Sequence, residues 1–187
     1  MSKTMQEQVN EGVLLPLMEA FYTIQGEGFH KGTAAYFIRV GGCDVGCHWC
    51  DVKESWDAEK HPPTVTEKIV DNATKYSDTV VITGGEPLTW DMTELTTQLK
   101  AKGAKLHIET SGAYQLSGVW DWICLSPKKL KLPTQEVYDK ANELKVIVFT
   151  PIILCSITIF YVLFIANPVY ESTAKIMSSS GGVEPAR

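Results

Sequence analysis

The sequence has no surplus of positive charge. Its 17 lysine and arginine residues are outnumbered by 22 aspartate and glutamate residues, so the net charge is −5 and the pI about 5.4. A protein that binds polyanions in general needs a basic surface, and this composition therefore argues against nucleic-acid binding. The single basic cluster, Lys128, Lys129 and Lys131, is typical of a solvated loop.

The sequence also lacks the apolar leader of a secreted protein and the cysteines of a disulfide framework. Residues 1–11 are polar, and we expect residues 1–12 to form a disordered leader. The five cysteines are an odd number and three are clustered, which favours metal binding in a reducing, cytoplasmic compartment. The other two, Cys124 and Cys155, lie in apolar runs and are expected to be buried bystanders.

Residues 13–149 alternate apolar strands with helical segments. Strands are expected at residues 14–24, 35–40, 79–83, 105–109, 119–125 and 144–149. Helices are expected behind the capping-box patterns at residues 64–67 and 91–94, and at residues 133–142. This order predicts an α/β fold with a parallel sheet and crossover helices, because continuous apolar strands are typical of strands covered on both faces.

Small and polar residues follow four of these strands. The segments are the cysteine-rich stretch at 41–51, Thr-Gly-Gly-Glu-Pro at 83–87, Glu-Thr-Ser-Gly at 109–112 and Ser-Pro-Lys at 126–128. The carboxyl ends of parallel strands lie at one side of a sheet, where ligands bind. We therefore expect the four segments to share one mouth.

Cys43, Cys47 and Cys50 form a Cys-x3-Cys-x2-Cys pattern. A closed zinc site needs four ligands, and His48 could be the fourth. However, His48 adjoins Cys47, where the backbone would usually turn its ring away from a shared metal. Three cysteines fit a [4Fe–4S] cluster with one iron open to a ligand. A zinc knuckle stays the alternative.

This cysteine pattern, with Trp49 before the last cysteine and Gly-Gly-Glu-Pro at 84–87, resembles the radical S-adenosylmethionine (radical SAM) family. The resemblance implies a partial, open parallel β/α barrel that binds a [4Fe–4S] cluster through the three cysteines, together with SAM. The narrower resemblance described next implies SAM contacts from Trp49, Gly85, Ser126 and Lys128. Each has an ordinary alternative: a core aromatic for Trp49, a tight turn for Gly85, and a solvent-exposed turn for Ser126 and Lys128.

A narrower resemblance covers about residues 15–149. The segments Phe-Tyr-Thr-Ile-Gln-Gly-Glu-Gly at 21–28 and Phe-Ile-Arg-Val-Gly-Gly-Cys at 37–43 resemble the 7-carboxy-7-deazaguanine synthases of queuosine biosynthesis. The resemblance implies a lyase in which a radical made from SAM converts 6-carboxy-5,6,7,8-tetrahydropterin to 7-carboxy-7-deazaguanine, with loss of ammonia. The implied substrate-binding residues are Ile24, Gln25, Gly26, Arg39 and Thr83. Arg39 would hold the substrate carboxylate, the alternative being a salt bridge on the strand.

The same resemblance implies magnesium, an electron donor such as flavodoxin or ferredoxin, and a homodimer. In this family a threonine or serine oxygen two residues after the last cysteine binds magnesium. That position is Val52, which has no side-chain oxygen. Asp51 and Ser55 are nearby, but the magnesium ligand stays unassigned.

The resemblance ends at Phe149. Residues 146–170 contain no charged residue, and residues 150–187 form an atypical hydrophobic tail. We hypothesise that this tail is out of frame, through a sequencing error or a real frameshift. If the tail is real, substrate contacts from the last third are missing, and we expect the chain to bind cluster and cofactor but to turn over poorly. The alternatives are a buried hydrophobic helix or a membrane anchor, although the independent apolar run, residues 151–166, is shorter than the roughly 20 residues of a membrane span.

Two further functions share parts of these patterns. A glycyl-radical-enzyme activase would have the same cluster but a protein partner. A non-catalytic zinc or iron–sulfur binding module with a membrane tail would use the cysteines alone. Residues 24–28 and Arg39 favour the enzyme that acts on a small molecule.

Overall fold

The computed structural model describes residues 4–146 and 150–165. The chain divides into two compact units, Met1–Val146 and Ile147–Arg187. The first unit holds every segment that the sequence assigned to the radical SAM core up to Val146. The expected strand at 144–149 lies partly outside the described residues.

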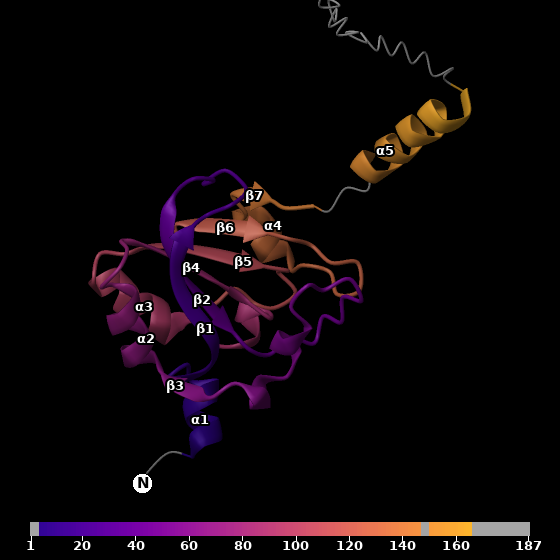
Figure 1. The fold of residues 1–187 in the computed structure, drawn as a ribbon. Coiled ribbons are helices and arrows are strands. Elements are labelled where there is room, and N and C mark those ends of the chain that lie inside the picture. Colours follow the sequence, from indigo (N-terminus) through magenta and orange to yellow (C-terminus); the bar gives the residue numbers. More distant parts are fainter. Residues whose placement is uncertain (1–3, 147–149, 166–187) are drawn as a thin grey trace, which may run out of the picture. The chain divides into compact units, whose positions relative to one another are not determined.

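A seven-stranded sheet forms the centre of the first unit (Figure 1). Its strands are β1 (Leu14–Ile24), β2 (Ala34–Val40), β3 (Pro63–Val65), β4 (Thr79–Gly84), β5 (Lys105–Thr110), β6 (Trp122–Leu125) and β7 (Glu143–Leu144). In space the order is β3-β1-β2-β4-β5-β6-β7. Neighbours from β2 to β7 are parallel, whereas β1 runs antiparallel to both β2 and β3. The sheet is therefore mostly, not wholly, parallel.

Helices cover one face of this sheet. The helices of the first unit are α1 (Met5–Asn10), α2 (Thr66–Ala73), α3 (Thr93–Ala101) and α4 (Gln135–Lys140). Apolar residues of α2 and α3 pack on the strands as one core, in which Ile69 and Leu95 meet Ile38, Ile82 and Leu106. Each such side chain, once fully buried, contributes roughly 1.5–3 kcal/mol relative to exposure. This core fixes the strands and hence the loops at their ends.

The opposite face of the sheet carries a smaller apolar cluster. Phe37 and Val81 are buried there, and the ring of Phe21 stacks on Phe37 with centroids 5.7 Å apart. Along β5 and β6, polar and aromatic side chains replace apolar ones on this face, including His107, Glu109 and Trp122. This side of the sheet therefore has room for a polar ligand.

Some element boundaries differ from the sequence-based expectations. The expected leader contains α1, because Thr4 accepts from the N–H of Glu7 at 3.3 Å and Glu7 accepts from the N–H of Thr4 at 2.7 Å. Neither expected capping box forms as predicted: Thr64 lies in β3, and the N-cap of α3 is Met92, although Asp91 accepts from the N–H of Thr93 at 2.9 Å. The strand expected at 119–125 begins only at Trp122.

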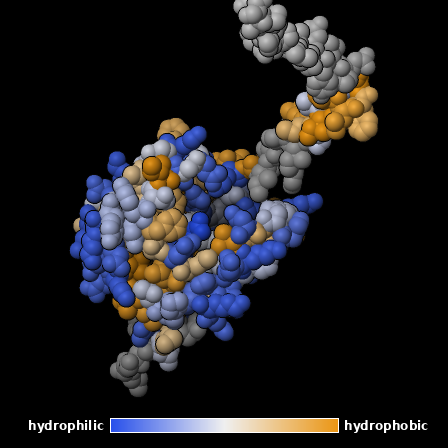
Figure 2. Space-filling view, in the orientation of Figure 1, coloured by the Kyte–Doolittle hydropathy of each residue, from blue (hydrophilic) through white to orange (hydrophobic). Residues whose placement is uncertain are grey.

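The second unit contains one described helical segment, α5 (Thr150–Phe160), which continues as a π-helical turn at Tyr161–Ile165. Side chains from Leu154 to Ile165 are exposed, and Figure 2 shows their apolar surface. Among the described residues, no helix is long and apolar enough to cross a membrane.

Candidate active site

The cysteine-rich loop, residues 41–51, follows β2 and is held firmly at its start. The N–H of Gly42 donates to the carbonyl of Ser55 at 2.7 Å, and that of Cys43 to Trp56 at 3.1 Å. The indole Nε1 of Trp90 donates to the carbonyl of Gly41 at 2.8 Å. The backbone before the first cysteine is therefore fixed by three independent contacts.

Two glycines let the loop after β4 approach the cysteine loop. A Cβ atom on Gly85 would lie 2.4 Å from the carbonyl oxygen of Gly42. Gly84 has a φ of +125°, and a Cβ there would lie 2.3 Å from the carbonyl oxygen of Val40. Only residues without a side chain fit these positions, so the Gly-Gly pair sets the distance between the two loops.

Glu86 joins the same loop to its next neighbour. This carboxylate is 1% exposed and accepts hydrogen bonds from the Thr110 hydroxyl at 2.5 Å and from the Ser111 N–H at 2.7 Å. The N–H of Ser126 in turn donates to the carbonyl of Thr110 at 2.8 Å. The four segments that the sequence predicted to share one mouth are thus connected by hydrogen bonds.

The three clustered cysteines are free thiols within this mouth. Cys47 is buried, and Cys43 and Cys50 are half-buried. Burial raises the pKa of Cys43 and of Cys47, and the neighbouring thiol of Cys50 raises both further. A bound metal cation would favour the thiolate form of these cysteines.

The geometry does not favour a single zinc ion. In the described part of the chain, no three His, Cys, Asp or Glu side chains are placed to hold one metal ion. His48 instead packs edge-on against Trp49, with ring centroids 4.3 Å apart. Cysteines that bind a polynuclear cluster each contact a separate iron, so their thiols need not converge on one point. The residues that the structure describes therefore present no preformed site for a single metal ion.

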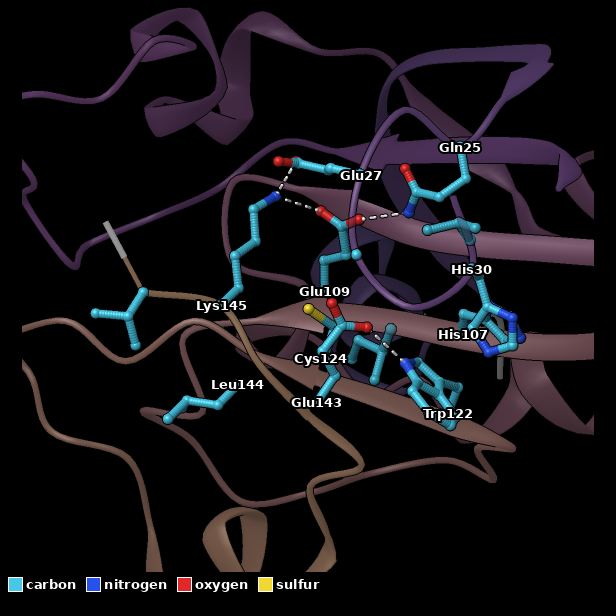
Figure 3. A pocket seen from close by; sticks show the side chains of 14 residues that line it. Gln25, Glu27, His30, His107, Glu109, Trp122, Cys124, Glu143, Leu144 and Lys145 are labelled. Atoms are coloured by element: carbon cyan, nitrogen blue, oxygen red, sulfur yellow. Dashed lines mark hydrogen bonds and ion pairs between the residues drawn. The ribbon is translucent and has the colours of Figure 1, made fainter. Parts of the chain in front are cut away.

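A pocket of about 230 Å³ lies beside β5, β6 and β7 (Figure 3). A chain of polar contacts crosses it. The amide of Gln25 donates to Glu109 at 3.0 Å, and the ammonium of Lys145 lies 3.6 Å from the other oxygen of Glu109. Lys145 also pairs with Glu27. The pocket thus presents a cation and two carboxylates to a ligand.

The pocket environment fixes the protonation of two of its side chains. Burial lowers the pKa of Lys145, but the hydrogen bond to Glu27 and the charge of Glu109 outweigh it, and the pKa is raised. Burial, with the charges of Glu143 and Glu109, raises the pKa of Cys124 to about 12. At neutral pH the pocket therefore contains an ammonium group and a neutral thiol.

Aromatic rings form one wall of the pocket. The rings of His30 and His107 lie 4.4 Å apart, and His30 also meets Trp122 edge-on at 4.5 Å. Glu143 accepts from the indole of Trp122 at 3.0 Å and from the N–H of Phe29 at 3.3 Å. These contacts hold residues 25–33, the loop between β1 and β2, against β6 and β7.

Comparison with known proteins decides the family. Residues 37–121 match the model of the radical SAM superfamily. The chain is 68% identical over 149 residues to the 7-carboxy-7-deazaguanine synthase of Flavobacterium psychrophilum, covering 80% of this chain and 71% of that protein. The chain belongs to the 7-carboxy-7-deazaguanine synthase family. The Synechocystis enzyme of the same name is 54% identical over 137 residues, which are 73% of this chain and 66% of that enzyme.

The fold agrees with this family. A crystal structure of QueE from Escherichia coli matches with a TM-score of 0.68 and 28% identity, covering 87% of this chain and 83% of that chain. The predicted α/β fold, a partial barrel of the radical SAM type, is therefore confirmed. The correction concerns β1 and β3, which add antiparallel strands at one edge.

The residues that the 7-carboxy-7-deazaguanine synthase resemblance assigned to SAM lie around the mouth. Trp49 is 44% exposed in the cysteine loop, and Gly85 contacts that loop directly. Lys128 donates to the hydroxyl of Ser126 at 2.6 Å, in the loop after β6. Both residues are half-buried, which fits either an exposed turn or a binding position. Both alternatives for this pair therefore stay open.

The residues assigned to the substrate of this family are less closely grouped. Of the five, only Gln25 lines the pocket. Arg39 donates to Glu19 at 2.8 Å and lies over the ring of Phe21, 5.5 Å from its centroid. Thr83 is the register partner of Arg39 on β4. Of the remaining two residues, Ile24 is 63% exposed. Gly26 has no heavy atom within 4 Å of the position that a Cβ atom would take.

Sequence reasoning missed several polar residues of the pocket, among them His30, His107, Glu109 and Lys145. Glu109 lies at the end of a predicted strand, and that position could have marked it as a site residue. His30, His107 and Lys145 had no such mark in the sequence, because they form a pocket only once residues 25–33 fold against β7. The expectation of two buried bystander cysteines is half wrong. Cys124 is buried but lines the pocket, and Cys155 is exposed.

Proposed function

We propose that the chain carries out the 7-carboxy-7-deazaguanine synthase reaction of queuosine biosynthesis at this mouth and pocket. The observation that carries the proposal is the hydrogen-bonded junction of the three-cysteine loop with the loops after β4, β5 and β6, next to a charged pocket. In this reaction 6-carboxy-5,6,7,8-tetrahydropterin contracts its ring and loses ammonia.

Membership of the radical SAM superfamily implies a [4Fe–4S] cluster and SAM. Cys43, Cys47 and Cys50 would hold the cluster, and their free thiols in one loop fit that task. When bound, the cluster and SAM supply the electron and the radical that start the reaction. The protein's share is to hold the thiols in place, orient the substrate and exclude water.

Four residues are proposed to contact SAM. Gly85, which packs against Gly42 with no room for a side chain, would contact the methionine end through its backbone. Trp49 offers an exposed aromatic surface to the adenine. Ser126 and Lys128, bonded to each other at 2.6 Å, would exchange that bond for contacts to the cofactor.

The pocket suits a carboxylated pterin. Such a substrate has several N–H donors and several acceptor oxygens, and Glu109 and Lys145 can bind groups of these two kinds. Gln25, with the adjacent backbone of Ile24 and Gly26, would bind the pterin edge. Arg39 would hold the substrate carboxylate in place of its present partner Glu19, and Thr83, beside it on β4, would touch the substrate.

The residues present do not fit a side-chain magnesium ligand after the last cysteine. Val52 has no side-chain oxygen, and Ser55 is 1% exposed with its hydroxyl donating to the carbonyl of Val52 at 2.7 Å. Asp51 is exposed at the surface of the loop. We therefore assign magnesium to no step.

Three finer expectations belong to this proposal. The electron would come from a protein such as flavodoxin or ferredoxin, the chain would form a homodimer, and the compartment would be cytoplasmic. Dimerisation is checked by light scattering of the loaded chain, where a monomer across the working concentration range would remove that part of the proposal.

Anaerobic reconstitution tests the cluster assignment. The full chain, given iron and sulfide, is expected to turn brown, absorb near roughly 400 nm and hold about four irons. Cys47→Ala should lose the cluster, whereas Cys155→Ala, which changes an exposed cysteine of the second unit, should keep it. A colourless protein with one zinc would support the non-catalytic binding module instead, and full iron content in Cys47→Ala would refute the ligand assignment.

A further inference from the structure

A group of three side chains joins the cysteine loop to two other loops of the mouth. Asp44 lies between Cys43 and Cys47, Tyr114 follows β5, and Lys131 follows β6. The ammonium of Lys131 donates to both carboxylate oxygens of Asp44, at 3.0 and 2.9 Å, and to the Tyr114 hydroxyl at 2.7 Å. Tyr114 donates in turn to Asp44. The three groups form a closed ring of hydrogen bonds, called here the Asp44 network.

The network holds a part of the loop that makes few other hydrogen bonds to its surroundings. The backbone bonds that fix the loop reach only as far as Cys43. Among the described residues, Asp44 is the only member of 44–49 whose side chain makes a hydrogen bond to another loop. The path from Cys43 to Cys47 is therefore held by this network together with the burial of the Val45 side chain, which is 4% exposed.

The two partners of Asp44 are themselves fixed. Tyr114 packs against the buried cluster that contains Leu88, Ile108 and Leu125. Lys131 is positioned by a backbone bridge to Lys128, and its ammonium lies over the ring of Tyr114, 3.9 Å from the centroid. A contact to these two residues is thus a contact to the frame of the sheet.

The network adds little to overall stability. Asp44 is 62% exposed and Lys131 35%, and ion pairs this accessible to water are weak. The network acts locally instead, because it fixes the position of Asp44 in the loop and pairs two opposite charges beside the cysteines. Removing either charge leaves the other uncompensated at that place.

We propose that the Asp44 network positions the second half of the cysteine loop and balances the charge next to the cluster. The inference rests on the proposed function, since it requires a cluster at the three cysteines. Asp44, Tyr114 and Lys131 are positioning residues: they act through the loop, not on substrate. An uncompensated negative charge favours the oxidised cluster and a positive charge the reduced one.

Midpoint potentials of the reconstituted full chain test the proposal. Lys131→Met should lower the potential and Asp44→Asn should raise it, while iron content stays near that of the unsubstituted chain. Tyr114→Phe should leave the potential nearly unchanged but hasten bleaching by oxygen several-fold, because the loop loses a fixed partner. Lys129→Met is the matched control: this exposed lysine of the same loop should change neither quantity.

The outcomes separate this inference from the proposed function. If the unsubstituted chain takes up no iron, the proposed function fails together with the inference. If it loads normally but Asp44→Asn and Lys131→Met match it in potential and oxygen sensitivity, only the inference fails.

Where a single variant takes up no iron, Asp44→Lys combined with Lys131→Asp decides. Recovery of iron in that exchange supports pairing of the two charges, and continued loss of iron overturns it. Circular dichroism confirms that each variant is folded.

Discussion

His107 is a buried base in the first unit, and its surroundings keep it neutral. It is 8% exposed, lies against His30 and Trp122, and has Lys105 nearby. Burial, followed by the charge of His30, lowers the pKa of His107 from 6.5 to about 4. Protonation of His107 would place a positive charge at a buried position beside His30 and Trp122, which is unfavourable.

His107 therefore makes stability depend on pH. The unfolded chain takes up this proton near pH 6.5 and the folded chain only near pH 4, so the contribution is complete above pH 6.5 and is lost as pH falls towards 4. The loss should be on the order of 2–3 kcal/mol. Urea unfolding at pH 7 and pH 5 measures it. His107→Gln should flatten the difference, while an equal dependence in that variant would contradict the assignment.

Lys145 is the cation of the pocket, and we predict that it serves substrate binding. Lys145→Met should lower kcat/KM for the carboxylated pterin by roughly tenfold or more, because a charged hydrogen bond contributes about 1.5–3 kcal/mol. SAM cleavage without substrate should be unchanged. Lys140→Met, which removes a surface pair with Glu136, is the control. Equal kinetics in the two variants would remove Lys145 from the substrate site.

At the scale of elements, the close packing of strand-end loops decides the geometry of the mouth. Gly85→Ala places a methyl group 2.4 Å from a backbone oxygen of the cysteine loop, which cannot move as a side chain could. We expect a loss of about 2 kcal/mol or more in the free energy of unfolding. Gly26→Ala, with no atom within 4 Å of the added carbon, should be neutral or slightly stabilising. Thermal unfolding of the two variants measures the contrast, and equal melting points would contradict the packing argument.

The sequence predicted the central strands well because their apolar runs are continuous. β2, β4 and β5 were expected within a residue or two of their observed ends. The direction of β1 was not predictable, since an apolar run does not state which way the chain crosses the sheet. The late start of β6 has a local cause: Asp121 bonds to Lys100 and to the N–H of Leu106, which holds the chain before Trp122 out of the strand.

The candidate site was predictable only where its residues are close in sequence. The cysteine loop and the glycines of residues 84–85 carry motifs with their own spacing. The pocket is different, because Gln25, Glu109 and Lys145 meet only after residues 25–33 fold across to β7. Contacts of this kind depend on tertiary structure, and single-sequence patterns do not contain them.

At the scale of the whole molecule, the two units raise different questions. The first unit holds the mouth, the pocket and the residues matched to the superfamily model. That residues 150–187 are an out-of-frame tail stays a hypothesis. Residues 166–187 lie outside those that the structure describes. Resequencing the gene tests it: a shift in frame near codon 150 would support the hypothesis, and one uninterrupted frame through that codon would remove it.

The central claim is that this chain makes 7-carboxy-7-deazaguanine with the residues of its mouth and pocket. The most direct measurement gives the reconstituted full chain dithionite, SAM and 6-carboxy-5,6,7,8-tetrahydropterin without oxygen, and detects products by mass spectrometry. We predict 7-carboxy-7-deazaguanine, dependent on SAM and absent with Cys47→Ala. A chain that holds its four irons and cleaves SAM, yet forms no deazaguanine, would contradict the claim.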